Sequence, residues 1–283
     1  MICHPPVKIN LGLNVLRKRP DGFHDLETLF IQSGQFRDSL EVIKADDWSR
    51  SLAELGGLYP PECIAQDISP DGKLMITVAR REGVDWPVLK DLCAKAYFLL
   101  DADFGLPPVK IYLEKKSPVG AGLGGGSADA AYCLKMLNEL CGLGLEREQL
   151  LPYAARLGSD CALFLYDCPV FGEGRGEVLR PFSLPIGIGG EYRLEIVVPE
   201  GISVSTAEAY RGIVPAIPEI RLEEALKRPV EEWKELIVND FEKSVFKEHP
   251  QLAAIKQSLY DSGAAYASMS GSGSALFALY EKE

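Results

Sequence analysis

The chain has 283 residues, of which 47% are hydrophobic and 25% are charged, an ordinary composition for a globular protein. At this length one large domain or two medium-sized domains are expected. The formal net charge is −11 at pH 7, whereas binding to nucleic acid or to an anionic membrane usually needs a basic patch. We therefore expect neither partner, and an anionic ligand would have to be held by local hydrogen-bond donors.

The cysteine content indicates a reducing compartment. The seven cysteines form neither a C-x-x-C motif nor a Cys/His cluster, which is typical of small buried hydrophobic residues. The chain opens without a charged leader followed by an apolar core, and no apolar run reaches the ~18 residues of a membrane span. These features predict a cytoplasmic protein.

The first part of the chain is expected to form β-strands. Residues 7–16 alternate apolar and polar side chains, which is the period of a half-buried strand. A turn signal at residues 20–22 follows, and strand patterns at 26–33 and 38–45 complete a predicted antiparallel β-meander. Residues 46–83 show no clear pattern apart from a candidate strand at 73–79.

Helices and strands mix along the rest of the chain. A helix at 88–105 and a strand at 109–116 precede a glycine-rich run. The elements expected after that run are helices at 127–144 and 145–160, a strand-like segment at 161–174, a strand at 193–199, helices at 206–213, 230–246 and 251–263, and two strands within 265–281. This pattern predicts an α+β protein with two domains, residues 1–168 and residues 169–283.

The glycine run is the most informative stretch of the sequence. Residues 116–131 read KSPVGAGLGGGSADAA, and glycine is kept where a positive φ or a close backbone approach is needed. A strand, a glycine run and a helix that opens at Ser127 together bring backbone N–H groups and a helix N-terminus onto a phosphate. The alternative is a flexible hairpin or a tight packing turn.

Two familiar phosphate motifs fit the run poorly. The Walker form needs a lysine before Ser127, which is absent. The dinucleotide form G-x-G-x-x-G matches at Gly120, Gly122 and Gly125, but it belongs in a βαβ unit with an acidic residue after the second strand. Here the predicted helix is followed by another helix, so a dinucleotide-dependent dehydrogenase is disfavoured.

Other features favour an anion cradle over a simple turn. The Ser127 side chain could cap the following helix or contact a metal-bound phosphate, and Asp129 lies in the first helical turn. A second glycine-serine turn, SGSGS, spans residues 270–274, and a lysine, Lys8, lies in the first strand.

Four segments carry a resemblance to a known family. PVGAGLGGGSADAA at 118–131 resembles the phosphate-binding motif of the GHMP kinases, the superfamily of galactokinase and of homoserine, mevalonate and phosphomevalonate kinases. Residues 6–30, GSDCALFL at 158–165 and SGSGSALF at 270–277 resemble the opening and later motifs in the same order. GLGGGSADAA and the D-G-aromatic-H turn are most similar to the branch that acts on 4-diphosphocytidyl-2-C-methyl-D-erythritol.

The resemblance implies both a fold and an activity. The fold would be α+β, with an N-terminal domain like domain 2 of ribosomal protein S5, a ferredoxin-like C-terminal domain and an active site in the cleft between them. The activity would be ATP- and Mg²⁺-dependent phosphorylation of the 2-hydroxyl of 4-diphosphocytidyl-2-C-methyl-D-erythritol, a step of non-mevalonate isoprenoid biosynthesis. The implied phosphate-binding residues are Pro118, Gly120, Gly122, Leu123, Gly124, Gly125, Gly126 and Ser127, with Ser127 also a candidate Mg²⁺ ligand.

Two residues would carry the chemistry. By resemblance, Asp160 would accept the proton of the attacking hydroxyl, and Lys8 would hold Asp160 and stabilise developing negative charge. A nearby ammonium also lowers the basicity of a carboxylate, which is tolerable when proton transfer comes late in a loose phosphoryl-transfer transition state. An isolated Asp160 would otherwise be interpreted as a helix N-cap, and an isolated Lys8 as a solvated lysine.

The remaining implied contacts concern the substrate. Phe23 and His24 resemble the pair that binds cytosine in this branch, because a base needs a stacking face and polar partners. Asn10 would orient either the methylerythritol hydroxyls or Lys8. The implied substrate-binding residues are Asn10, Phe23, His24, Phe30, Thr206 and Tyr210, and the implied closing loop is Gly271, Ser272 and Gly273, which is also compatible with a hairpin turn.

The sequence departs from the family at one position and leaves alternative functions open. Where the family usually has Asp-Asn-Leu for the nucleoside of ATP, the nearest match is Lys90-Asp91-Leu92. A GHMP kinase for homoserine, mevalonate or a sugar remains an alternative, although those substrates carry no base for Phe23 and His24 to stack on. A nucleotide-binding member without activity is disfavoured by the presence of both Lys8 and Asp160.

Overall fold

The chain forms two compact units, and each is assembled from three segments. A computed structural model describes residues 1–282. The first unit comprises Met1–Val7, Phe36–Ser117 and Gly124–Leu165, and the second comprises Lys8–Gln35, Pro118–Leu123 and Tyr166–Glu283. Because the units interleave along the chain, they do not test a single domain boundary at residue 168, which stays a prediction.

The first unit is built on a mixed β-sheet. In spatial order its strands are β1 (Ile2–Cys3), β4 (Ser39–Lys44), β7 (Val109–Lys115), β6 (Leu74–Arg80) and β5 (Ile64–Ile68). Strands β6 and β7 pair in parallel, whereas the other neighbours pair antiparallel. Parallel neighbours need a crossover connection, and α2 (Leu92–Phe104) provides it.

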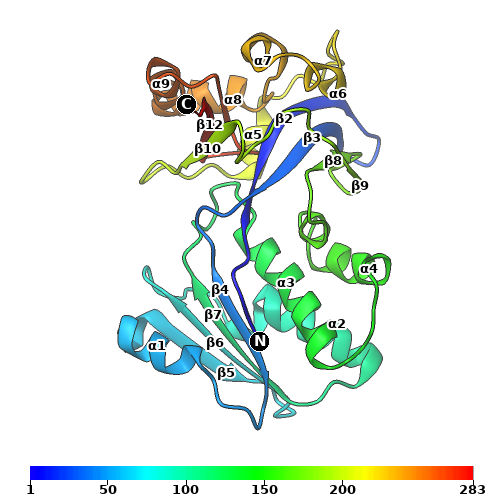
Figure 1. Ribbon diagram of the computed structural model, residues 1–283, viewed down its shortest axis with the longest axis vertical. Helices are drawn as coiled ribbons and strands as arrows, with labels where there is room; N and C mark the ends of the chain where they lie inside the picture. Colours follow the sequence, from blue (N-terminus) through cyan, green and yellow to red (C-terminus); the bar gives the residue numbers. More distant parts are fainter. Residues whose placement is uncertain (283) are drawn as a thin grey trace. The chain divides into compact units, whose positions relative to one another are not determined.

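Helices cover the sheet of the first unit. The other helices are α1 (Ser51–Leu58), α3 (Gly125–Leu140) and α4 (Arg147–Leu157), with short 3-10 helices η1 (Pro61–Cys63), η2 (Val88–Lys90) and η3 (Ala162–Leu165). Leu55 of α1 and Tyr59, which directly follows the helix, pack with Ile43, Ala79 and Tyr112 of the sheet. Figure 1 shows α2 and α3 side by side, away from α1.

Helix α2 ends at Gly105 as the sequence predicts, but it begins at Leu92 and not at residue 88, because η2 occupies Val88–Lys90. The Asp91 carboxylate accepts a hydrogen bond from the Cys93 N–H at the N-cap, and Gly105 takes the left-handed conformation at the C-cap with φ 62°. Glycine is the residue that adopts this C-cap conformation without steric cost. Strand β7 follows α2 after a short connection, and the glycine run begins directly after β7.

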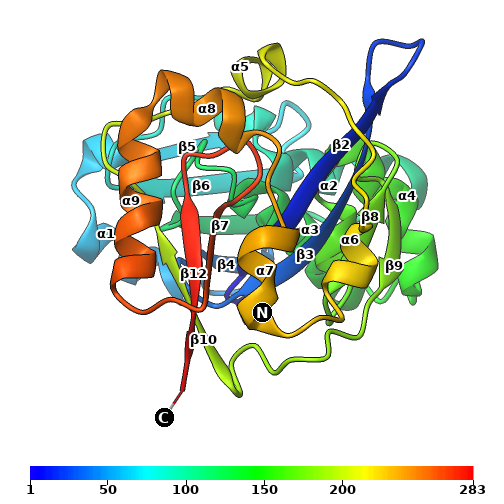
Figure 2. The ribbon, with the colours of Figure 1, turned by 90° about the horizontal axis from the view of Figure 1, so that it is seen from above.

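The second unit contains two sheets and a group of short helices. One sheet has the order β2 (Val7–Lys18), β3 (His24–Ser33), β8 (Val170–Glu173) and β9 (Val178–Pro181), and the other has β10 (Tyr192–Val197), β12 (Leu276–Glu281) and β11 (Tyr266–Met269). The helices are α5 (Thr206–Arg211), α6 (Leu222–Ala225), α7 (Val230–Leu236), α8 (Glu242–Glu248) and α9 (Pro250–Asp261). Figure 2 shows α9 lying along β12.

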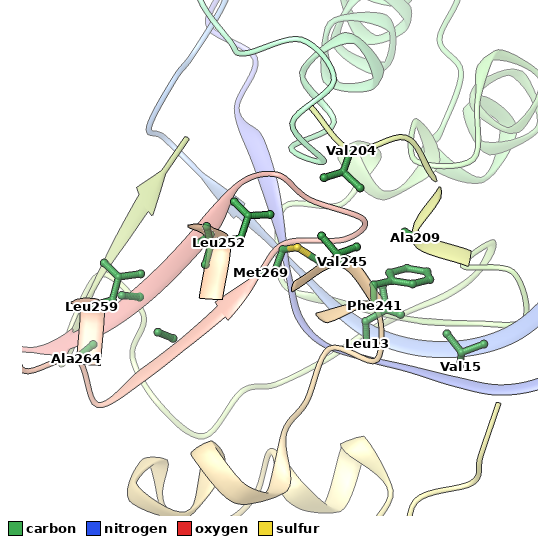
Figure 3. Close-up of a cluster of buried hydrophobic side chains, with 13 residues drawn as sticks. Leu13, Val15, Val204, Ala209, Phe241, Val245, Leu252, Leu259, Ala264 and Met269 are labelled. Atoms are coloured by element: carbon green, nitrogen blue, oxygen red, sulfur yellow. The ribbon is translucent and has the colours of Figure 1, made fainter. Parts of the chain in front are cut away.

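One hydrophobic cluster joins both sheets of the second unit to its helices. Leu13 and Val15 of β2 belong to the same cluster as Met269 of β11 (Figure 3). Phe241 precedes α8, and Leu252 lies on α9, fully buried. Burial of these side chains from strands far apart in the sequence fixes the second unit around β2, which carries Lys8 and Asn10.

The structure corrects several sequence-based expectations. Strand β4 pairs with β1 and β7 and not with β3, so the predicted β-meander is wrong. Residues 161–174 begin with the 3-10 helix η3, and only their end is a strand. The single helix expected at 230–246 is divided into α7 and α8, and between them the Asn239 side chain accepts a hydrogen bond from the Phe241 N–H.

The structure also shows which elements the segment at 46–83 forms and which cysteines are buried. The segment forms α1, η1, β5 and β6, which includes the candidate strand at 73–79. All seven cysteines are free thiols, of which Cys93, Cys133 and Cys161 are buried and Cys168 is exposed. The expectation of buried cysteines is therefore right for three of them and wrong for Cys168.

We expect Leu252→Ala to destabilise the second unit strongly. Removing a fully buried leucine from a packed cluster costs about 2–5 kcal/mol in the free energy of unfolding. Equilibrium urea unfolding measures the effect, and Ile217→Ala, at a side chain that is 70% exposed, is the matched control. Equal midpoints for the two variants would contradict the packing described for α9.

Candidate active site

A buried lysine organises one part of the site, within the second unit. Lys8 is 4% exposed, and its Nζ donates to Asn10 Oδ1 at 2.6 Å. Asn10 Nδ2 in turn donates to Thr28 Oγ1 at 3.0 Å, and Thr28 Oγ1 donates to the Gly12 carbonyl. The Lys8 Nζ also lies 5.6 Å from the centroid of the Phe30 ring. This series of hydrogen bonds holds the Lys8 ammonium in one position and gives the buried charge the hydrogen-bond partner that it needs.

The first half of the glycine run lies against Lys8 and the glycine-serine turn. The Lys8 N–H donates to the Leu123 carbonyl at 2.8 Å, and the Ala275 N–H donates to the Ala121 carbonyl at 3.1 Å. A Cβ on Gly122 would lie 2.6 Å from the Ser270 carbonyl oxygen. Gly122 also has φ +77°, so no other residue fits at this position without strain.

The glycine-serine turn approaches the lysine itself. A Cβ on Gly271 would lie 3.1 Å from Asn10 Oδ1 and 3.5 Å from Lys8 Nζ. The Asn10 N–H donates to Ser270 Oγ at 3.3 Å. Gly271 therefore packs closely against Asn10 and Lys8, whereas closure of this turn over the phosphates stays a prediction.

Asn239 holds the backbone of this turn by hydrogen bonds. The sequence analysis did not identify this residue. Its Nδ2 donates to the Met269 carbonyl at 2.7 Å and to the Gly271 carbonyl at 2.8 Å. The side chain is 2% exposed. Its only signal in the sequence is the break it makes in the apolar pattern of residues 230–246.

The second half of the run lies in the first unit and starts helix α3. Gly124 is the N-cap residue, with φ 70°, and α3 begins at Gly125. Ser127 is thus the third residue of the helix, and the expectation that the helix opens at Ser127 is wrong. The first N–H groups of an α-helix have no partner within the helix, so the amides of Gly125, Gly126 and Ser127 are donors that could bind an anion at the start of α3.

The turn that carries Asp160 belongs to the same unit as α3. Asp160 precedes η3, is half-buried, and accepts from Ser159 Oγ at 3.3 Å. Its neighbour Cys161 is buried, and burial raises the pKa of the Cys161 thiol to about 11, although a hydrogen bond with the Ser127 hydroxyl works in the opposite direction. The Cys161–Ser127 contact therefore places the Asp160 turn beside the first turn of α3.

An aromatic stack lies at the turn where the sequence predicted a cytosine site. The His24 and Tyr210 rings stack with centroids 4.9 Å apart and an interplanar angle of 23°, and Phe241 meets Tyr210 edge-on at 4.7 Å. Phe23 is 53% exposed, with the Arg175 guanidinium 4.8 Å from its ring centroid. Aromatic faces of this kind suit a planar base.

Thr206 and Lys90-Asp91-Leu92 have local roles in the structure. Thr206 Oγ1 lies 3.4 Å from Ser272 Oγ, which links the start of α5 to the closing turn. Asp91 caps α2 and also accepts from the Trp86 indole N–H at 3.1 Å. The Asp91 carboxylate is therefore used within the protein at the position where the family usually contacts the nucleoside.

Comparison with known proteins agrees with the geometry. The family GHMP kinases N terminal domain matches residues 91–168, and GHMP kinases C terminal matches residues 222–283. The chain is 44% identical to the 4-diphosphocytidyl-2-C-methyl-D-erythritol kinase of Parabacteroides distasonis, over 100% of this chain and 92% of the relative. It is 45% identical to the enzyme of the same name from Bacteroides thetaiotaomicron, over 100% and 93%.

The chain belongs to the GHMP kinase family. A crystal structure of 4-(cytidine 5'-diphospho)-2C-methyl-D-erythritol kinase is similar as well, with a TM-score of 0.74 and 30% identity over 99% of this chain and 90% of that one. The expectation of a two-domain GHMP kinase fold is thereby confirmed. Within residues 1–282, none of the helices is long and apolar enough to cross a membrane.

The donors for a metal ion are sparse in this GHMP kinase. Among residues 1–282, no three His, Cys, Asp or Glu side chains come together to hold a metal. Mg²⁺ commonly keeps several waters and takes one or two protein ligands together with substrate phosphates. A metal ion at this site would therefore need most of its ligands from water or a bound nucleotide, with the Ser127 hydroxyl in the first turn of α3 as a candidate ligand.

We expect Gly122→Ala to weaken ATP binding far more than Gly120→Ala. Both positions have φ near +80°, but no described atom lies within 4 Å of a Cβ on Gly120, whereas one on Gly122 would collide with the Ser270 carbonyl. The variants share the backbone strain and differ only in the collision. Calorimetric titration should show a difference of about tenfold or more in the ATP dissociation constant, about 1.4 kcal/mol. Equal losses would contradict the packing of the run against Ser270.

Proposed function

We propose that this chain is an ATP-dependent kinase that phosphorylates the 2-hydroxyl of 4-diphosphocytidyl-2-C-methyl-D-erythritol, in non-mevalonate isoprenoid biosynthesis. One observation carries the kinase assignment: the buried Lys8 ammonium lies beside two glycine turns whose backbones leave no room for a Cβ. Phosphoryl transfer needs positioning and charge stabilisation more than covalent chemistry, and this arrangement can supply both. The full-length likeness to relatives of that name supports the substrate.

ATP would be bound through its phosphates by the glycine run. The proposed phosphate-binding residues are Pro118, Gly120, Gly122, Leu123, Gly124, Gly125, Gly126 and Ser127. The amides at the start of α3 would face the phosphates, where the helix dipole favours negative charge. Ser127 would hold Mg²⁺ that arrives with the nucleotide, and the ion neutralises charge on the phosphates.

Asp160 and Lys8 are the proposed catalytic residues. Asp160 would accept the proton of the attacking hydroxyl, and Lys8 would hold Asp160 and stabilise the charge that develops on the transferring phosphoryl group. Asn10 fixes the Lys8 ammonium by a 2.6 Å hydrogen bond, so its proposed contribution is orientation. The turn of Gly271, Ser272 and Gly273 would close over the phosphates with its backbone.

The cytosine would be bound by the aromatic side chains of the second unit. His24 is held flat by its stack on Tyr210, and Phe23 offers an exposed face at the same turn. The proposed substrate-binding residues are Asn10, Phe23, His24, Phe30, Thr206 and Tyr210. Homoserine, mevalonate and simple sugars have no planar base, so these aromatic faces favour the cytidyl substrate over them.

The domain assignment follows from these roles. We propose that residues 1–168 form the ATP-binding domain and that residues 169–283 complete the site as the C-terminal domain. The cytoplasm is the proposed compartment, since the substrates are small soluble metabolites. Nucleic acid and membranes are not proposed as partners, because the net charge of −11 opposes polyanionic surfaces.

ADP release with Mg²⁺-ATP tests the function directly. We expect turnover with 4-diphosphocytidyl-2-C-methyl-D-erythritol and not with homoserine, mevalonate or galactose, because only the first has a base to stack. Turnover with one of the other alcohols would keep the kinase assignment and discard the cytosine site. Binding of ATP without ADP release from any candidate would favour a nucleotide-binding protein without activity.

Asp160→Asn tests the proposed base. The amide cannot accept the proton, so we expect kcat to fall by about 10²–10⁴-fold while ATP still binds. Ser159→Ala is the matched control, since it removes only the hydroxyl that donates to Asp160. Full activity of Asp160→Asn in the same ADP-release assay would rule out Asp160 as the base.

A further inference from the structure

A buried polar cluster lies directly behind the glycine run, and the proposed chemistry does not use it. Its members are Asp38, Lys115, Ser117 and Asp129, all in the first unit and all at most 7% exposed. Asp38 precedes β4, Lys115 ends β7, and Asp129 lies in the first turns of α3. We call these four residues the clasp.

The Lys115 ammonium is fully occupied within the clasp. Its Nζ donates to Asp38 Oδ2, to Asp129 Oδ2 at 2.6 Å and to Ser117 Oγ at 3.0 Å. An ammonium has three N–H donors, so none is left for a phosphate. Burial lowers the pKa of Lys115, but the Asp129 and Asp38 carboxylates outweigh it and the pKa lies above its ordinary value.

Asp38 binds the chain just before the glycine run. Its Oδ1 accepts from the N–H groups of Lys116 and Ser117, both at 2.6 Å, and its Oδ2 accepts from Ser117 Oγ at 2.6 Å as well as from Lys115. All the acceptor positions of the carboxylate are thus used. The backbone at residues 115–117, where the run begins, is held by one buried side chain.

The clasp also reaches the residue at which α3 begins. A Cβ on Gly125 would lie 2.1 Å from Ser117 Oγ and 3.5 Å from Asp38 Oδ2. Ser117 therefore touches the helix start, and Lys115 ties it to Asp129 one turn further on. The two ends of the loop at residues 118–124 are fixed to each other by these contacts.

We infer that the clasp is a positioning device, which sets the conformation of the phosphate-binding loop and thereby the affinity for ATP. The inference rests on the proposed role of residues 118–127 in binding phosphate. A loop that binds an anion through backbone N–H groups depends on their geometry, and misplacement of catalytic groups by about 1 Å can cost about 10²-fold in rate. The clasp residues touch no substrate in this scheme and act only through the backbone.

Asp129 offers a test that separates shape from charge. Its Oδ2 is bonded to Lys115, whereas its Oδ1 is buried and has no hydrogen-bond partner among residues 1–282. An asparagine can still accept from Lys115 with its amide oxygen, and a leucine cannot. Asp129→Asn should therefore preserve the clasp, and Asp129→Leu should break it.

The experiment measures nucleotide affinity in a set of matched variants of the full chain. Titration calorimetry with ATP, together with KM for ATP and for the alcohol, is carried out on wild type, Asp38→Asn, Asp129→Leu, Asp129→Asn and Ser117→Ala. Glu41→Gln is the control, because Glu41 is also a buried carboxylate, on β4, and accepts from Ser49 Oγ and from the N–H groups of Arg50 and Ser51. Thermal unfolding midpoints of all variants show how much stability each change removes.

We expect Asp38→Asn and Asp129→Leu to raise the ATP dissociation constant and KM by about tenfold or more while KM for the alcohol stays within about twofold. Asp129→Asn should stay close to wild type, and Glu41→Gln should lose a similar amount of stability without any change in ATP affinity. If Asp38→Asn does not fold, Ser117→Ala, which deletes one hydroxyl, should still weaken ATP binding.

Two results would overturn the inference. One is unchanged ATP affinity in the folded clasp variants, and the other is an equal loss of ATP affinity in Glu41→Gln, which would indicate a purely structural role. The identity of the accepted alcohol is tested separately, because ATP titration does not depend on it. Wild-type protein that binds ATP but phosphorylates another alcohol would contradict the proposed substrate and leave the clasp intact.

Discussion

The rest of the site depends on the absence of side chains at Gly122 and Gly125. A Cβ on Gly122 would lie 2.6 Å from the Ser270 carbonyl oxygen, and a Cβ on Gly125 would lie 2.1 Å from Ser117 Oγ. The backbone is thus pressed against a turn in one unit and against a polar cluster in the other. Such contacts offset the large loss of conformational entropy that ordering a loop with several glycines entails.

The two units solve the problem of a buried lysine in different ways. Lys8 has an amide oxygen, Asn10 Oδ1, as its neutral partner at 2.6 Å, whereas Lys115 has two carboxylates and a hydroxyl. An ammonium whose charge is balanced by carboxylates contributes little field to its surroundings, because the opposite charges cancel at short range. We assign the developing negative charge and the contact with Asp160 to Lys8, so the two buried lysines have different proposed roles.

Much of the fold and the site could be predicted because the signals are local. Strand periodicity located β2 and β7, and the sequence of a strand, a glycine run and a helix located the proposed phosphate loop. The errors arise where contacts with residues distant in the sequence determine the local structure. Strand β4 leaves the predicted meander because it pairs with β7, about 70 residues later. The start of α3 moves to Gly125 because Gly124 itself takes the N-cap position.

The sequence analysis missed several supporting residues for the same physical reason, which is that their partners are distant in the sequence. Asp38 and Lys115 are separated by 77 positions, and nothing near Asp38 in the sequence indicates a partner. Asn239 lies 32 positions before Gly271, whose carbonyl it binds. In a sequence, a buried polar side chain cannot be distinguished from a polar residue at the surface. Its structural role becomes visible only from its burial and its satisfied hydrogen bonds. The family resemblance supplied the proposed catalytic residues and Asn10, but it did not indicate Asp38, Lys115 or Asn239.

The proposed phosphate loop receives little positive charge from the two lysines next to it in the sequence. The chain has a net charge of −11, and the two lysines just before the run are engaged elsewhere, Lys115 in the clasp and Lys116 with Glu114 at 2.6 Å. Besides Lys8, the donors that we propose at the loop are backbone N–H groups and the positive end of the α3 dipole. These are partial charges, which act only at short range and in the correct geometry. Affinity in such a loop must come from shape, so the polar cluster that fixes its two ends is as much a part of the proposed binding site as the glycines themselves.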